Sequence, residues 1–197
     1  MSQTPRNDLF PVFLKVDKLG VLIVGGGGAA SEKARFLLRS SPNAKLTVVA
    51  SEISDEIQTL SIQYPNMKLV KRPFDFGDLE EEDILIAATE QHELNKKIRE
   101  KAKALKILVN VADTPELCDF YLGSIVTKGD LKIAVSTNGK SPTFAKRFSE
   151  LLEDALPDDL QQVLDNLHEI RSRLKGDFSR KVKALNELTS NLVAKHG

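Results

Sequence analysis

The chain has 197 residues, of which 41% are apolar, so it can form one large domain or a moderate domain plus a smaller one. Its 28 basic and 28 acidic residues balance, which argues against a general nucleic-acid binder because such proteins carry a clear basic excess. No apolar run is long enough for a signal peptide or a membrane span, and the single cysteine, Cys118, excludes an internal disulfide, so we expect a cytoplasmic protein.

Strands and helices alternate over the first part of the chain. The apolar run at 20–24 predicts a buried parallel strand, and the helical spacing of apolar residues at 29–39 predicts a helix. The same pattern predicts strands at 45–50, 67–70, 83–88 and 107–111, and helices at 54–62 and 91–105. We expect Ser54 to cap the first of these two helices, and Ile62 and Leu105 to face inward. The alternation predicts an α/β fold with a parallel sheet.

The pattern changes after Asp113. Two β-rich runs at 124–128 and 131–136 flank Gly129-Asp130, which predicts a hairpin. Helical patterns follow at 143–156, 159–174 and 178–194. We therefore divide the chain into an α/β domain at 1–112, a short β-rich connector at 113–147 and a helical domain at 148–197.

A glycine loop lies directly after the first predicted strand and before the first helix. Residues 25–30 read GGGGAA and fit the pattern G-x-G-x-x-A. Gly25 makes the tight turn, Gly27 lets a pyrophosphate approach the backbone, and the small Ala30 lets helix and strand pack closely, while the helix start offers free N–H groups. This context indicates a Rossmann-like dinucleotide site. A purely structural turn is the alternative, but four glycines exceed what a turn needs.

The second strand lacks the acidic residue that often bonds the ribose of NAD. It ends at Ala50 and Ser51, with Glu52 one step later, and no arginine stands there for the 2′-phosphate of NADP. Ser51 or the backbone would then serve the ribose, and this position specifies the cofactor only weakly.

Asp113 follows the fifth predicted strand. Ligands in open α/β sheets lie outside the carboxyl ends of the strands, so a carboxylate here can accept a proton while a hydride leaves to NAD. The alternative is a local turn, which Asp before Thr114-Pro115 commonly forms.

Several motifs keep a fixed order along the chain: FPVFLKV (10–16), VLIVGGGGAASEKARFLL (21–38), ILIAATEQHELN (84–95), ILVNVADTPELCDF (107–120) and IAVSTNGKSP (133–142). With these motifs, residues 10–156 resemble the precorrin-2 dehydrogenases, also called the dehydrogenase/ferrochelatase module of siroheme synthases. The family often has a glycine where Asn138 stands, but asparagine tolerates a positive φ, so the turn can survive.

The resemblance implies a homodimer with a Rossmann domain, a dimerisation region at the connector and a helical domain. It implies NAD-dependent oxidation of precorrin-2 to sirohydrochlorin, with Asp113 as the proton acceptor, and in some members ferrous iron insertion. Together with the glycine loop it gives the candidate residues. Those for NAD are Gly25, Gly27, Gly28, Ala29, Ala30, Ser51, Ala88, Thr89 and Asn110. Those for the substrate are Thr137, Asn138, Lys140 and Ser141.

Other expectations concern metals and partners. The three histidines are isolated from Cys118 and from one another, so we expect no metal site in the protein. We expect neither nucleic acid nor membrane as a partner, and no fused methyltransferase domain in a chain of this length. Metal insertion stays open at this point. So does a second class of function, a non-catalytic NAD(H)-sensing module whose helical tail binds a protein partner.

Overall fold

The computed structural model describes residues 6–174 and 178–188, which divide into two compact units. The first unit extends to Gly123 and includes Ser136–Pro142, whereas the second contains Ser124–Val135 and the helices from Thr143 onward. Among the described residues, no helix is both long and apolar enough to cross a membrane.

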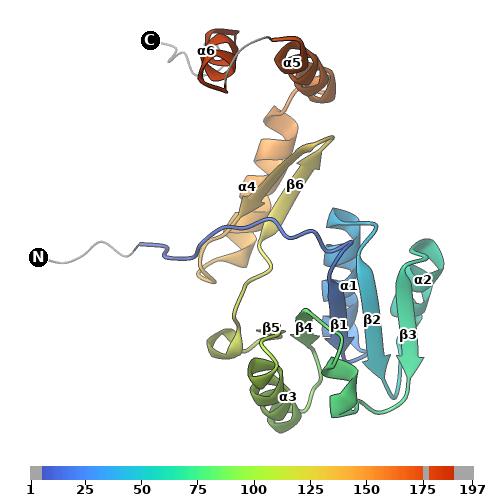
Figure 1. The fold of residues 1–197 in the computed structure, drawn as a ribbon. Helices are drawn as coiled ribbons and strands as arrows, with labels where there is room; N and C mark the ends of the chain where they lie inside the picture. Colours follow the sequence, from blue (N-terminus) through green and yellow to red (C-terminus); the bar gives the residue numbers. More distant parts are fainter. Residues whose placement is uncertain (1–5, 175–177, 189–197) are drawn as a thin grey trace, which may run out of the picture. The chain divides into compact units, whose positions relative to one another are not determined.

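The first unit is built on a five-stranded parallel sheet (Figure 1). The strands are β1 (Gly20–Val24), β2 (Lys45–Ala50), β3 (Met67–Lys71), β4 (Ile84–Ala87) and β5 (Leu108–Val111). Their order across the sheet is β3-β2-β1-β4-β5, and every neighbouring pair is parallel. This sheet confirms the predicted α/β class.

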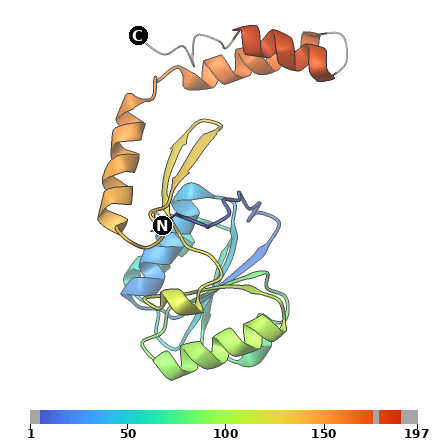
Figure 2. The same ribbon diagram turned by 90° about the vertical axis from the view of Figure 1, so that its left-hand side faces the viewer.

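Helices cover both faces of the sheet (Figures 1 and 2). The helices α1 (Gly28–Ser40) and α2 (Asp55–Gln63) share one buried cluster with Val21 and Ile23 of β1. The helix α3 (His92–Ala104) and the short 3₁₀ turn η1 (Phe76–Leu79) share the other cluster with Leu22 and Val24. Because successive strand residues point to opposite faces, the continuous apolar run of β1 supplies both layers.

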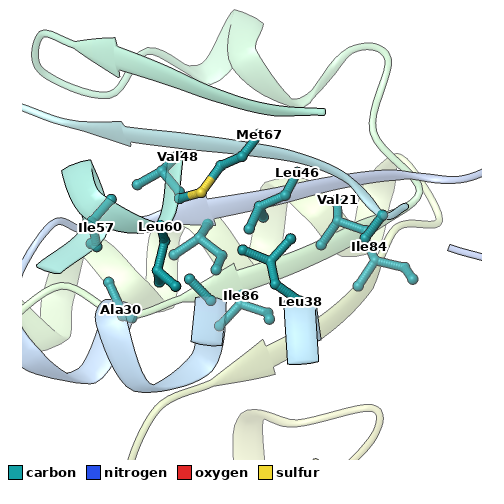
Figure 3. Close-up of a cluster of buried hydrophobic side chains, with 14 of the residues drawn as sticks. Val21, Ala30, Leu38, Leu46, Val48, Ile57, Leu60, Met67, Ile84 and Ile86 are labelled. Carbon is teal, nitrogen blue, oxygen red and sulfur yellow. The ribbon is translucent and has the colours of Figure 1, made fainter. Parts of the chain in front are cut away.

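Apolar spacing explains how the first helices pack. Ala30, Ala34 and Leu38 recur every four residues along α1 and are fully buried against the strands (Figure 3). The helix α2 begins as predicted, because the Ser54 side chain accepts a hydrogen bond from the Ile57 N–H. The spacing of small and branched side chains thus fixes the layer that carries the glycine loop.

The helix α3 ends in a left-handed residue. Lys106 has a φ of 63°, the Ile107 N–H bonds the Ala102 carbonyl and the Lys106 N–H bonds that of Lys103. These two bonds make a Schellman cap, in which glycine is the usual left-handed residue. The cap turns the chain directly into β5.

Two expectations about side-chain direction were wrong. Ile62 is 83% exposed and Leu105 is 43% exposed. The buried face of α2 holds Ile57 and Leu60, and Ile62 lies about 200° further round the helix from Leu60. Leu105 is the cap residue of α3 and follows its last buried turn. Among the described residues, the ends of the predicted elements differ from the observed ones by at most one residue, apart from the last helix.

The second unit contains the predicted hairpin, formed by β6 (Ser124–Lys128) and β7 (Leu131–Val135). Gly129 has a φ of 58°, which the first position of a tight hairpin turn requires. The helices α4 (Pro142–Ala155), α5 (Leu160–Arg173) and α6 (Phe178–Leu188) follow. Residues 189–194 of the last predicted helix lie outside the described residues.

Candidate dinucleotide and substrate site

Three loops leave the sheet at the same edge, the one formed by the carboxyl ends of its strands. Val24, Ala87 and Val111 form one row across β1, β4 and β5. Beyond this row, the Ala88 N–H still bonds the Val24 carbonyl (2.8 Å) and the Ala112 N–H bonds that of Ala87 (2.9 Å). The strand order reverses direction between β1 and β4, and open α/β sheets bind ligands in the crevice at such a point.

The first two glycines of the loop are required by packing. Gly25 has a φ of 126°, and a Cβ there would overlap the carbonyl of Ala88. A Cβ on Gly26 would overlap the Glu52 carbonyl and lie 2.8 Å from the Ala50 Cβ. The loop after β1 is therefore pressed between the ends of β2 and β4, where only glycine fits.

The next two glycines are not required by packing. A Cβ on Gly27 or Gly28 would meet nothing within 4 Å, and neither residue has a positive φ. Both stand at the start of α1, whose first turn contains no acidic residue. The missing side chains leave a cradle in front of the first N–H groups of the helix, and this cradle fits a pyrophosphate.

Two serines hold this loop from behind, a role that the sequence reasoning assigned to neither, although it predicted Ser54 as a helix cap. Ser31 is buried, and its Oγ donates to the Gly27 carbonyl (3.1 Å) and lies 2.9 Å from the Ser54 Oγ. The Ser54 N–H also bonds the Gly26 carbonyl (3.0 Å). Ser31 on the apolar face of α1 was the available signal, because buried hydroxyls need partners. Ala29 is half-buried and Ala30 is fully buried between helix and strand, as predicted for Ala30.

The end of β2 presents exposed polar groups. Ser51 and Glu52 are both exposed there. Arg72, which follows β3 at the same edge, bonds the carboxylate of Asp78 (2.8 Å) and the Pro73 carbonyl (3.0 Å). This guanidinium lowers the pKa of Asp78 through its hydrogen bond. The cation is thereby held by the β3–β4 connection.

The end of β4 is fixed by a buried amide. Ala88 is buried, and Thr89 is half-buried. The Thr89 Oγ1 donates to the Asn95 Oδ1 (2.7 Å), and the Asn95 Nδ2 donates to the Thr89 carbonyl (2.9 Å). Asn95 itself is 2% exposed. Thr89 therefore has one defined orientation beside the glycine loop.

Asp113 lies at the end of β5 in a strained conformation. Its φ is 57° and it is exposed. A left-handed conformation costs most non-glycine residues about 1–2 kcal/mol and aspartate or asparagine less, and strain of this kind gathers at functional sites. The turn that the sequence offered as an alternative is also present, since the Thr114 N–H bonds the Val111 carbonyl (3.3 Å). The turn presents the carboxylate at the common edge.

Asn110 lies below that edge. It is buried, and its Nδ2 donates to the carbonyl of Phe120 (2.9 Å). Its neighbour Cys118 donates through Sγ to the Val111 carbonyl (3.3 Å), and burial raises the pKa of this thiol. Both side chains fasten the returning segment 117–120 along the free edge of β5.

The candidate substrate residues form a tight loop at Ser136–Pro142. Thr137 Oγ1 donates to the Ser141 carbonyl and accepts the Ser141 N–H, each at 3.1 Å. Asn138 has a φ of 53° and Gly139 a φ of 75°, which confirms that asparagine sustains this turn. Lys140 is exposed.

Neither Lys128 nor a cluster of metal-ligating side chains adds a further site in the described part of the chain. In the second unit, Lys128 Nζ bonds the Leu156 carbonyl (2.6 Å) and the Asp158 carboxylate (2.8 Å), so it is held within that unit. Across residues 6–174 and 178–188, no group of three or more His, Cys, Asp or Glu side chains could hold a metal ion.

Comparison with solved structures and curated proteins gives consistent matches. The solved structure "SirC, precorrin-2 dehydrogenase" is similar with a TM-score of 0.70 and 28% identity, covering 91% of this chain and 89% of that one. Siroheme synthases are similar over 87–89% of the chain: 38% identical in Psychrobacter cryohalolentis, 34% in Nitrosomonas europaea and 36% in Salmonella typhi. The chain spans 32%, 36% and 37% of the length of these three relatives, about a third of each.

Two family descriptions cover successive parts of the chain. Residues 128–155 match the family described as "Sirohaem biosynthesis protein central". Residues 12–124, more than half of the chain, match the family described as "Putative NAD(P)-binding". The second match spans the parallel sheet, the glycine cradle and Asp113, and the protein belongs to this putative NAD(P)-binding family.

Proposed function

We propose that this protein oxidises precorrin-2 to sirohydrochlorin with NAD as the hydride acceptor. One observation carries the proposal: Asp113 is held with a φ of 57° at the sheet edge where the glycine cradle also opens. A structural turn alone does not need a carboxylate at a strained position on the same edge of the sheet as a dinucleotide cradle.

The distance across this edge suits the cofactor. From β1 through β4 to β5 there are two strand spacings, or about 10 Å. The nicotinamide half of a dinucleotide is of comparable length. A pyrophosphate on the cradle would therefore bring the nicotinamide toward Asp113, past Ala88 and Thr89.

Each candidate residue has a role in this proposal. The N–H groups after Gly27 and Gly28 bind the pyrophosphate, and Ser51 bonds the ribose. NAD, when bound, accepts the hydride. Asp113 takes the proton that leaves the substrate, so the macrocycle loses one hydride and one proton. Thr137, Asn138, Lys140 and Ser141 bind the substrate, with Lys140 pairing one of its carboxylates. Asn110 is buried and bonds the Phe120 carbonyl, so in this proposal it holds the segment after β5 rather than the cofactor.

The relatives support the substrate class. The similar solved structure is named a precorrin-2 dehydrogenase, and its match covers about nine tenths of both chains. The similar curated proteins are named siroheme synthases. We carry over from these names the substrate and its oxidation. The cytoplasmic location and the domain order of 1–112, 113–147 and 148–197 are proposed from the sequence.

A homodimer is part of the proposal. Large apolar side chains are exposed in both units: Phe10 (86%), Phe13 (68%), Phe144 (59%) and Leu151 (61%). Exposed apolar groups of this size indicate an interaction surface. Sedimentation equilibrium tests the dimer, and a monomer at micromolar concentration would contradict it.

Anaerobic turnover of precorrin-2 with NAD tests the activity. We expect the sirohydrochlorin spectrum only with NAD, and loss of turnover with retained NADH binding in Asp113→Asn. Asparagine keeps the left-handed backbone, so this variant removes only the proton acceptor. Adding ferrous iron to the same assay tests metal insertion. NADH binding without any sirohydrochlorin would instead favour the sensing module.

A further inference from the structure

We infer that α3 carries two positioning residues for the site, Asn95 for the cofactor end of β4 and Arg99 for the Asp113 loop at the end of β5. This inference rests on the proposed function for the meaning of the site. It extends that function to two side chains that touch neither cofactor nor substrate.

Asn95 controls the β4 end through a closed pair of hydrogen bonds. Its amide accepts from the Thr89 Oγ1 and donates to the Thr89 carbonyl. The Gln91 N–H bonds the same Oγ1 (3.2 Å), which ties the start of α3 into the pair. Because Ala88 and Thr89 lie against Gly25, the orientation of Thr89 also sets the wall of the glycine loop.

Arg99 controls the loop on the next strand. Its Nε donates to the Leu117 carbonyl (2.8 Å), and its Nη2 bonds the Asp119 Oδ1 (2.6 Å). The other carboxylate oxygen of Asp119 accepts the Val109 N–H (3.0 Å), and the Asp119 N–H bonds the Val109 carbonyl (2.7 Å). One guanidinium therefore clamps the returning segment 117–120, which closes the Asp113 loop.

The clamp is costly as a purely structural device. The Arg99 side chain is 15% exposed, and its Nη1 is buried with no hydrogen-bond partner in the described part of the chain. A buried charge with an unsatisfied donor is a poor source of stability, since an apolar side chain often does as well. An arginine at position 99 is explained if the Asp113 loop has to be fixed in one geometry.

The two residues are one helical turn apart. Positions 95 and 99 are related as i and i+4, so they share one face of α3. That face lies against β4 and β5 in the buried cluster of Ile98 and Ala102. A single rigid helix thus sets the spacing between the cofactor wall and the proton acceptor.

The test compares Arg99→Gln, Asn95→Ala and the exposed α3 control Lys97→Gln in the full chain. The dissociation constant for NADH is measured by its own fluorescence, which no tryptophan disturbs because the chain has none. The kcat is measured with precorrin-2 at saturating NAD. Arg99→Lys is the conservative rescue, and Asn95→Asp keeps the acceptor for Thr89 if Asn95→Ala does not fold.

The expected effects differ between the two sites. Arg99→Gln lowers kcat about 10- to 100-fold with the NADH constant within about twofold, because a displaced catalytic group costs rate rather than cofactor affinity. Arg99→Lys recovers part of the loss. The Asn95 variants raise the NADH constant about tenfold, roughly the contribution of one lost polar contact. Lys97→Gln changes neither quantity.

Two results would overturn the inference. One is an unchanged kcat in Arg99→Gln. The other is that Arg99→Gln and Asn95→Ala each change kcat and the dissociation constant for NADH by the same factor. If wild-type protein does not oxidise precorrin-2, the proposed function fails and amide hydrogen exchange decides the inference. Arg99→Gln must then speed amide exchange in residues 112–117 but not in residues 87–91, and Asn95→Ala must speed exchange in residues 87–91 but not in residues 112–117. Equal exchange of both segments in either variant would contradict the inference.

Discussion

Replacing Gly27 with serine separates what the fold requires from what the cofactor requires. Gly27 is the N-cap of α1, in an extended conformation, and a side chain there meets nothing within 4 Å. Serine is a better cap than glycine, because its oxygen accepts an N–H from the first turn. We therefore expect the free energy of unfolding to rise by a few tenths of a kcal/mol.

The same serine should damage cofactor binding. Its side chain fills the cradle and occupies an N–H group that the pyrophosphate would use. A hydrogen bond to a charged group contributes about 1.5–3 kcal/mol, so the dissociation constant for NADH should rise roughly 10- to 100-fold.

Gly26→Ala is the matched control, and it should have the opposite effect on stability. A Cβ there lies 2.8 Å from the Ala50 Cβ and overlaps the Glu52 carbonyl. Overpacking of this kind costs about 1–3 kcal/mol, which lowers the Tm of a chain of this size by roughly 2–12 °C. Calorimetry measures the Tm of each variant, and NADH fluorescence titration measures its dissociation constant for NADH. A Gly27→Ser protein that binds NADH as tightly as wild type would refute the pyrophosphate site at α1.

Three further predictions concern stability. Burial, and next the charge of Asp83, raise the pKa of Glu82 to about 7 from 4.5, so wild-type stability falls as pH rises between these values. Solvent screens part of this effect, so Glu82→Gln should be about 1–2 kcal/mol more stable than wild type at pH 8 and no more stable at pH 4.5. The two proteins are unfolded in urea at each pH, and identical unfolding curves of variant and wild type at both pH values would contradict this. Leu38→Ala empties a fully buried position and should cost about 2–5 kcal/mol in the same urea assay, whereas a loss below 1 kcal/mol would mean that α1 is not packed as described. Lys106→Gly relieves a φ of 63° and should stabilise the protein by about 1 kcal/mol with turnover unchanged; a lower Tm would argue against the Schellman cap.

The sheet and the glycine loop were predictable because local patterns encode them. The run GVLIV at Gly20–Val24 followed by four glycines has few other interpretations, and the observed strand ends at Val24, directly before the glycines. The capping role of Ser54 was predictable for the same reason, since one side chain and one N–H decide it. The hairpin needed only Gly129-Asp130 between two β-rich runs.

The supports of the site were not predictable, because they depend on contacts between distant residues. Arg99 and Asp119 are twenty positions apart, and Ser31 and Ser54 twenty-three, so no local spacing connects them. The prediction that Ile62 faces inward was wrong for a related reason. An apolar residue in a helix faces the core only if it shares the angular position of its buried neighbours. The pattern of a short helix leaves that position undefined.

Lys106, Asp113 and Asn138, the non-glycine residues with a positive φ in the described part of the chain, separate fold from function. All have φ values of 53–63°, where glycine is the least strained residue. At Lys106 the conformation ends a helix, and glycine would serve better. At Asp113 glycine would relieve the same strain, yet it would remove the carboxylate from the edge that faces the cradle. A left-handed φ alone therefore does not mark a functional residue, and removing the side chain is the test: Asp113→Gly should be more stable than wild type and inactive, whereas Lys106→Gly should keep its turnover.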